Sequence, residues 1–342
     1  MILCLILAVG LQDWTLHTDN FEEIIQIQDM AVGDDDSLYL LDRREARIYV
    51  VNTAGEVQRS FGSKGQGPGE FQAPGSLVFF DGMLYVWDFQ VSGWSMYHPD
   101  GTFQAVLEVG RRSNQSFPLD RTRLLVRDVN DYFKKDVTGA EMLVVEGEQK
   151  TALRKYDVSQ HAGPFVIRSK VGMTSHESDW LPLAVFAYAP ASKRLYLGHT
   201  AALDLWIMDS ATYKKVGAIK AKLPVMPFTD EDIESRKMVF VRDGKKYGTK
   251  DLPGLPDVKP VILKLQADEL GRVWVFLTPS NIRSRTVEVW VYDQQGRKQG
   301  RLLLPRHVKI ARIDKSHLWV WGDHSKRDDQ FIARAPYKLG DP

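Results

Sequence analysis

The sequence predicts an all-β fold, a six-bladed β-propeller built from four-stranded antiparallel blades. The first observation is a short apolar strand that recurs six times along the 342 residues. The second is its spacing, because three of the intervals are 46, 40 and 45 residues, which matches a propeller blade of about 40–50 residues. The two longer intervals predict insertions. The six copies are Leu38–Asp42, Leu84–Asp88, Leu124–Asp128, Leu195–Gly198, Val273–Phe276 and Leu318–Gly322.

The four strands of the first blade can each be assigned from its sequence. Polar, Gly-containing segments at 33–36 and 53–56 are typical of the turns that close hairpins. They separate apolar runs that we assign, from the inner to the outer strand, to residues 24–32, 37–41, 47–52 and 57–61. Large rings suit the spaces between packed blades, and the alternating Trp87, Trp274, Trp319 and Trp321 are expected to fill them.

The two ends of the chain are expected to meet in one blade. The sixth blade shows strands near 308–313, 317–321 and 330–335, and its fourth strand is missing. An open ring would leave two exposed sheet edges, which invite aggregation. Residues 12–17 precede the first blade, so we predict that they supply the outer strand of the sixth and close the ring.

Two insertions are expected. Thr229 has the character of a helix N-cap with Asp232 three residues later, and Phe228 and Ile233 are placed to form a hydrophobic staple across it. We therefore predict one short helix, from about 230 to 239, within an insertion at about 226–250 between blades four and five. The second insertion, at 131–149, is polar and is predicted to be an extended hairpin or loop within blade three.

The N-terminal residues 1–11 are continuously apolar but too short to span a bilayer. They resemble the core of a secretory signal, although the basic region is missing, and the alternative is a first β-strand. We expect a signal-peptide remnant at 1–11, a single propeller domain at 12–342, and a periplasmic or secreted protein without a transmembrane span. Cys4 is the only cysteine, and a lipoprotein anchor at this residue would require an earlier start. The net charge of +1 argues against nucleic-acid partners.

A glycine-rich run, SFGSKGQGPGEF at 60–71, precedes Pro74 and the strand at 81–88. This stretch resembles the NHL-like six-bladed β-propellers of bacteria, and the overall fold is similar to TolB-type propellers. The resemblance is specific over blades one and two, and it implies an exported propeller without implying an activity. A phosphate-binding loop would need a following helix and a Lys-Ser/Thr pair. We therefore interpret the run as a connection between two blades, with Phe71 filling the gap between them.

Loops between the second and third strands of several blades carry the candidate ligand-binding residues. Equivalent loops gather on one face of a propeller, so this face is expected to be basic and partly aromatic, suited to a carboxylate, a sugar or an acidic peptide. Acidic neighbours such as Asp42, Asp88 and Asp323 leave an ordinary solvated rim as the alternative. The candidates are Arg43, Arg44, Arg47, Trp94, Arg283, Arg285, Lys326 and Arg327.

An enzyme is the alternative. A lactonase-like hydrolase would hold a divalent metal on the axis, with Asp29, Asp268 and Asp314 as oxygen donors. An NHL-type lyase would need a histidine cluster, and no histidine pair has zinc-motif spacing. We therefore expect an exported, non-catalytic binding or protein-interaction scaffold without a cofactor, and a divalent metal only under the enzyme alternative. The candidate histidines are His161, His176, His199, His307, His317 and His324.

Overall fold

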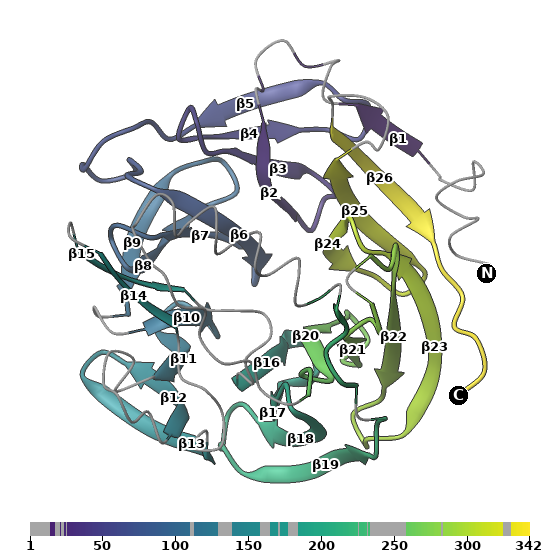
Figure 1. The fold of residues 1–342 in the computed structure, drawn as a ribbon. Helices are drawn as coiled ribbons and strands as arrows, with labels where there is room; N and C mark the ends of the chain where they lie inside the picture. Colours follow the sequence, from purple (N-terminus) through teal and green to yellow (C-terminus); the bar gives the residue numbers. More distant parts are fainter. Residues whose placement is uncertain are drawn as a thin grey trace.

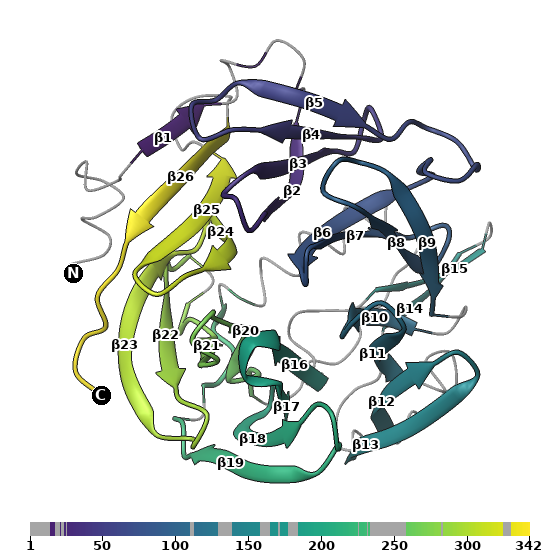
Figure 2. The ribbon, with the colours of Figure 1, turned by 180° about the vertical axis from the view of Figure 1, so that it is seen from behind.

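The fold is a ring of six four-stranded antiparallel sheets around a central channel (Figure 1), which confirms the predicted architecture. In blades one to five the first strand in the sequence is the innermost, and Figure 2 shows the same ring from behind. The computed structural model describes residues 14–17, 21, 24, 26–109, 113–128, 139–157, 165–169, 172–176, 184–224, 226–230, 232, 258–281, 283–323 and 330–342.

Blades one to three follow the chain from the inner to the outer strand. Blade one contains β2 (Ile27–Val32), β3 (Leu38–Asp42), β4 (Arg47–Val51) and β5 (Val57–Phe61). Blade two contains β6 (Pro74–Phe80), β7 (Met83–Asp88), β8 (Gly93–Tyr97) and β9 (Phe103–Glu108). Blade three contains β10 (Ser113–Pro118), β11 (Arg123–Asp128), β12 (Gly139–Glu146) and β13 (Gln149–Asp157).

Blades four to six repeat this order, except that the outer strand of blade six comes from the start of the chain. Blade four contains β16 (Ala184–Ala189), β17 (Arg194–His199), β18 (Ala202–Asp209) and β19 (Lys215–Ala221). Blade five contains β20 (Ile262–Ala267), β21 (Val273–Leu277), β22 (Thr286–Tyr292) and β23 (Lys298–Pro305). Blade six contains β24 (Val308–Ile313), β25 (His317–Asp323), β26 (Gln330–Pro336) and β1 (Trp14–His17).

The second strand of each blade forms the core, because other blades cover both of its faces. All residues of β3 and β7 are buried, which explains why these strands are apolar at nearly every position. The four tryptophans Trp87, Trp274, Trp319 and Trp321 are at most 8% exposed. Their predicted place between blades is confirmed.

Strand β1 is hydrogen bonded antiparallel to β26, with Trp14 opposite Arg334 and His17 opposite Phe331. The side-chain amide of Gln330 adds a second link between the last and first blades. It accepts a hydrogen bond from the N–H of Ile27 (2.6 Å) and donates one to the Ile27 carbonyl (3.0 Å). These contacts join residues 303 positions apart.

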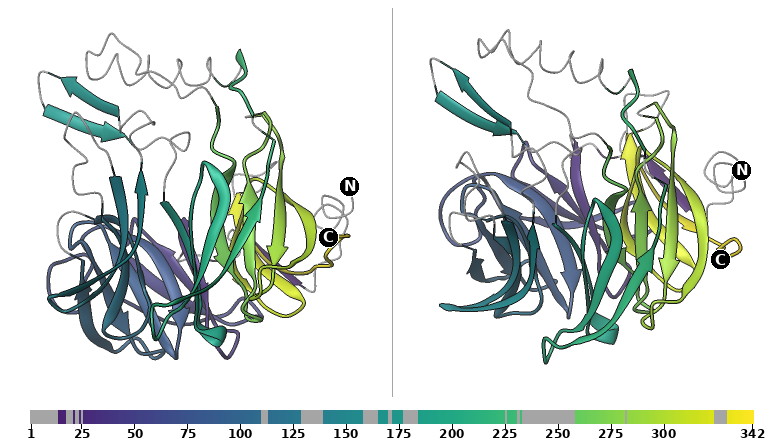
Figure 3. Two further views of the ribbon diagram at one scale, coloured as in Figure 1. Left: turned by 90° about the horizontal axis from the view of Figure 1, so that it is seen from below. Right: turned by 60° about the horizontal axis from the view of Figure 1, so that its bottom comes forward.

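The two faces of the ring differ in what they carry. The turn face holds the connections between first and second strands and between third and fourth strands. The insertion face holds the connections between second and third strands and those between blades. A two-stranded hairpin, β14 (Phe165–Ser169) with β15 (Gly172–His176), comes between blades three and four in the sequence and projects from the insertion face (Figure 3). The sequence did not reveal this hairpin.

The predicted insertions need correction. Within 131–149, residues Gly139–Glu146 form β12, a regular third strand paired with β11 and β13, so the irregular part is shorter than expected. The predicted helical insertion is unsupported as an element, because only Asp230 and Asp232 of it are described, both helical, while 231 and 233–257 lie outside the described residues. The helical element in the described part of the chain is one 3₁₀ turn, Pro190–Ser192. The cap residues are described: the Thr229 hydroxyl accepts from the Asp232 N–H (3.2 Å), and Asp232 accepts from the Thr229 N–H (2.8 Å).

Candidate ligand-binding cavity in the central channel

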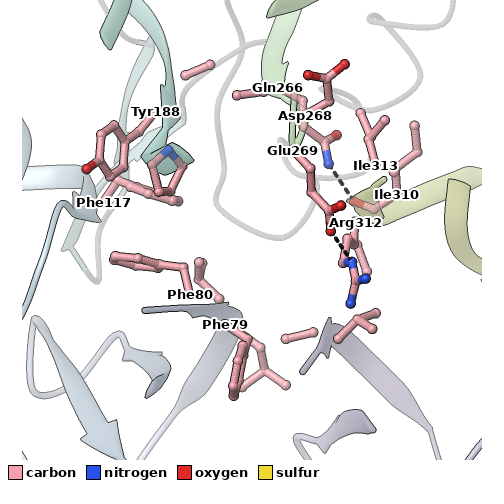
Figure 4. Close-up of a pocket in the computed structure, with 18 of the residues that line it drawn as sticks. Phe79, Phe80, Phe117, Tyr188, Gln266, Asp268, Glu269, Ile310, Arg312 and Ile313 are labelled. Carbon is pink, nitrogen blue, oxygen red and sulfur yellow. Dashed lines mark hydrogen bonds and ion pairs between the residues drawn. The ribbon is translucent and has the colours of Figure 1, made fainter. Parts of the chain in front are cut away.

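A cavity of about 700 Å³ occupies the channel toward the turn face (Figure 4). Every blade contributes the C-terminal part of its inner strand, and several blades add the turn that follows. One wall is aromatic and the other carries polar and charged side chains (Figure 4). A concave, partly apolar site with a few convergent polar groups is the usual form of a small-molecule site.

The aromatic wall comes from blades two, three and four. Phe80 stacks on Phe117 with ring centroids 6.2 Å apart, and Phe117 meets Phe186 and Tyr188 edge to face at 6.1 and 6.5 Å. Phe79 stacks on Tyr39 at 5.4 Å. The five lining rings, Phe79, Phe80, Phe117, Phe186 and Tyr188, are only half-buried. The wall therefore offers ring faces and edges to a ligand.

The opposite wall comes from blades five and six. Arg312 bonds to Glu269 (2.7 Å), to Asp36 (3.2 Å) and to the carbonyl of Gly33 (2.8 Å), so its charge is fixed and compensated. Gln266 donates to the carbonyl of Ile310 at 3.2 Å. These contacts cross from blade five to six and from blade six to one. They make the polar wall rigid.

Asp29 forms the inner end of the cavity on β2. One carboxylate oxygen accepts the N–H of Met30 and the other accepts the N–H of Leu77 in blade two, both at 2.9 Å. Burial raises the pKa of Asp29 to about 6, although these two N–H groups and the positive charges of Lys309 and Lys264 act in the opposite direction. The surroundings of Asp29 therefore disfavour the negatively charged form of its carboxylate.

Lys264 and Lys309 lie beside Asp29 on the inner strands of blades five and six. Lys264 pairs in register with Phe276, and Lys309 pairs with Trp321, which are equivalent positions in their blades. Each amine rests on the ring of its partner, at 4.4 Å for Lys264 and 3.9 Å for Lys309. The pKa of Lys264 is lowered by burial against the opposing effect of Asp29, and the charge of Lys309 lowers it further.

The predicted ligand-binding residues lie away from this cavity. Arg43 and Arg44 are exposed in the β3–β4 turn, and Arg283 and Arg285 are exposed before β22. These two loops share the insertion face but belong to blades one and five, which blade six separates. Arg47 is half-buried and donates to Ser60 at 3.2 Å. Lys326 and Arg327 lie outside the described residues.

Trp94 is a core residue. It is 4% exposed, its indole N–H donates to the hydroxyl of Ser116 (2.9 Å), and its ring lies 5.5 Å from that of Trp87. Asp42 and Asp88 are buried as well. Asp88 accepts N–H groups of Gln72 and Gln90, and Asp42 accepts that of Arg44, so both hold the ends of strands in place. Neither carboxylate is therefore exposed on the rim.

The carboxylates considered as metal donors do not converge. Asp268 accepts from Arg272 (2.6 Å) and the indole of Trp274 (2.8 Å), and Asp314 accepts the N–H groups of Ser316 and His317 in the matching turn of blade six. Both carboxylates therefore secure turns and are separate from Asp29. Within the described ranges no three His, Cys, Asp or Glu side chains are placed to hold a metal ion.

The glycine-rich run lies between β5 and β6, where a strand and not a helix follows it. Phe71 is fully buried with Leu84 and Tyr97 of blade two, as expected for a plug between blades. Gly67 donates its N–H to the Glu70 carboxylate at 2.8 Å. The loop is thus filled by its own acidic side chain, which is unsuited to a phosphate.

A family model described as a 6-bladed beta-propeller, DUF5128, matches residues 14–236. The chain belongs to this family. Membership of DUF5128 agrees with the fold, while the narrower NHL-like or TolB-type assignment stays a prediction. No curated protein sequence matches the chain.

Solved structures show the same fold at low identity. A DUF4221 family member from Bacteroides vulgatus has a TM-score of 0.56 and 11% identity, covering 97% of this DUF5128 chain and 98% of its own. A putative exported protein from Bacteroides fragilis has a TM-score of 0.50 and 10% identity, covering 92% and 91%. No helix in the described part of the chain is long and apolar enough to cross a membrane.

Proposed function

We propose that this protein is a non-catalytic binding propeller that holds a small, ring-bearing ligand in its central channel. The observation that carries the proposal is the cavity of about 700 Å³, with half-buried rings on one wall and fixed polar groups on the other. Aromatic faces bind sugar or aryl rings, and the polar wall supplies hydrogen bonds that orient them. The ligand enters from the turn face, where the cavity lies.

Export to the periplasm or the exterior is part of the proposal. Its support is the apolar segment at 1–11, which lies outside the described residues, and the likeness in fold to a putative exported protein. A binding protein in the cell envelope can capture a solute without any catalytic group. The arginines of the insertion face are proposed as a second surface, for a protein or acidic peptide.

The experiment is a thermal-shift screen with sugars and ring compounds, neutral and acidic, together with native mass spectrometry of the purified protein. A ligand at 100 times its Kd adds about 2.7 kcal/mol to the free energy of unfolding, so its binding raises Tm. Phe117→Leu with Phe186→Leu should abolish that increase. Phe103→Leu is the control, since Phe103 packs edge to face on Tyr97, 5.6 Å away and outside the cavity.

Two results would overturn the proposal. One is a screen without any stabilising compound and a mass spectrum without a bound molecule. The other is equal binding by the Phe117/Phe186 double variant and the Phe103 control. Elemental analysis with and without a chelator tests the hydrolase or lyase alternative: a stoichiometric divalent metal whose removal lowers Tm would favour an enzyme.

A further inference from the structure

Two exposed lysines, Lys264 and Lys309, lie on the inner strands next to the residues that line the cavity, at the level of Asp29, and they lack the partners that lysines near carboxylates usually have. Neither Lys264 nor Lys309 is joined to a carboxylate within 4.0 Å in the described part of the chain. Asp29 faces both electrostatically, but its oxygens accept backbone N–H groups of Met30 and Leu77. Two ammonium groups and one carboxylate leave an excess of positive charge here.

The aromatic rings under these amines fix where the charges stand. Each amine lies about 4 Å from a ring centroid, Lys264 on Phe276 and Lys309 on Trp321, within the range of a cation–π contact. The rings hold the amines without neutralising them. An anion placed between the amines would reduce their repulsion and gain two charge-assisted hydrogen bonds.

The strand register gives the distance from these amines to the aromatic wall. Phe117 pairs with Leu125, the position equivalent to the partner of Gln266, so Phe117 lies two residues farther along the channel than Lys264. Phe80 pairs with Met83 and lies four residues farther. At about 3.3 Å per residue, the rings stand roughly 7–13 Å from the amines along the axis.

From this arrangement we infer that the ligand is an elongated carboxylate: its acid group binds between Lys264 and Lys309, and a ring about 7–13 Å away packs on Phe117 and Phe80. The inference rests on the proposed function, because it names the class of ligand for the same cavity. A sugar ring and an aryl ring share the required chemistry. The arms of the experiment distinguish them.

Isothermal titration with two matched pairs of compounds tests the inference. Lactobionate and lactitol share a galactose ring and a similar length, but only lactobionate has a carboxylate. 4-Phenylbutyrate and 4-phenylbutanol form the aryl pair. We expect the acid of one pair to bind at least tenfold more tightly than its neutral partner, since only the acid accepts charge-assisted hydrogen bonds from the two amines. The pair that binds identifies the ring.

Lys264→Met and Lys309→Met should each weaken binding of that acid by about tenfold, because methionine keeps an apolar side chain over the ring and removes the charge. The neutral partner should bind these variants as it binds the wild type. Lys298→Met is the matched control, since Lys298 also lies over a tryptophan, Trp290 at 3.7 Å, but on the outer strand of blade five. Unchanged Tm values show that the variants fold.

Equal binding of acid and neutral compound, or unchanged binding by the Lys264 and Lys309 variants, would overturn the inference and leave the cavity as a binding site for neutral rings. Failure of both acids at millimolar concentration would also overturn it. The proposed function fails separately, when the wider screen and the mass spectrum show no bound molecule at all.

Discussion

Gln330 forms a two-way hydrogen bond with the backbone of Ile27, accepting its N–H at 2.6 Å and donating to its carbonyl at 3.0 Å. The side-chain amide thus behaves like a peptide group of an added strand. Both backbone groups of Ile27 are satisfied in a buried setting by a residue from the other end of the chain. The first and last blades are joined at this point.

Gln330→Leu should lower the free energy of unfolding by about 2–6 kcal/mol, because it removes the hydrogen-bond partner of a buried N–H and of a buried carbonyl, at about 1–3 kcal/mol each. Urea unfolding monitored by tryptophan fluorescence measures the change. Gln299→Leu is the control, since Gln299 bonds to Asp293 at an exposed position. A Gln330 variant as stable as the control would show that the contact contributes nothing.

Removal of residues 12–18 should lower Tm and promote association. The deletion removes β1 and exposes the edge of β26 along Phe331–Arg334, and an unpaired edge recruits other strands. Differential scanning calorimetry and size-exclusion chromatography measure the two effects. An unchanged Tm would show that the pairing of β1 with β26 does not stabilise the ring.

The pKa of about 6 for Asp29 has a consequence for stability. The folded state binds this proton more tightly than the unfolded state, whose pKa is near 3.8, so the free energy of unfolding falls as pH rises from about 4 to 6 and stays lower above. Asp29→Asn removes this dependence. The free energy of unfolding of the wild type, minus that of Asp29→Asn, should therefore decrease by roughly 2–3 kcal/mol between pH 3.5 and 7.5.

Urea unfolding at several pH values provides that comparison. Asp29→Asn also loses one acceptor for the N–H groups of Met30 and Leu77, which adds a constant offset. Asp34→Asn, at an exposed turn residue, is the control. Parallel curves for wild type and Asp29→Asn would contradict the prediction.

Asp232 and Lys259 form a buried ion pair between the cap residues and the start of blade five, and Lys259 also donates to the carbonyl of Ser280 (2.8 Å). Asp232→Ala alone should lower the free energy of unfolding by about 3–5 kcal/mol, because it leaves the buried ammonium group of Lys259 without its carboxylate partner. The double variant Asp232→Leu with Lys259→Met should be closer to wild type. Chemical unfolding of the three proteins decides this, and equal losses for the single and double variants would argue against a coupled pair.

The insertion face makes a separate prediction. Arg43→Ala with Arg285→Ala should weaken binding of a poly-glutamate peptide by a few fold and leave Tm unchanged, because both side chains are exposed. Fluorescence anisotropy at two salt concentrations measures the binding. Equal affinity of the double variant and the wild type would remove the basic-face hypothesis.

The sequence was sufficient for the architecture, because each second strand is largely buried and repeats as an apolar run along the chain. Leu38–Asp42 and Met83–Asp88 are examples. The hairpin of β14 and β15 has no such repeat, so spacing revealed only that residues had been added there. The N-cap at Thr229 was readable because capping is local, three residues apart.

The cavity was less accessible to sequence reasoning. Asp29, Lys264 and Lys309 come from blades one, five and six, and their common level in the channel depends on a bulge in β24, between Ile310 and Arg312, that no local pattern announces. The exposed arginines drew the prediction to the insertion face instead. One signal was present: a lysine on an inner strand, opposite an aromatic residue in the recurring strand, occurs in two successive blades.

The pairing of β1 with β26 also bears on biosynthesis. Strand β1 has no partner until β26, more than 300 residues later, has been synthesised. Throughout that interval the growing chain keeps an open edge in its sixth blade, and its finished blades cannot close into a ring.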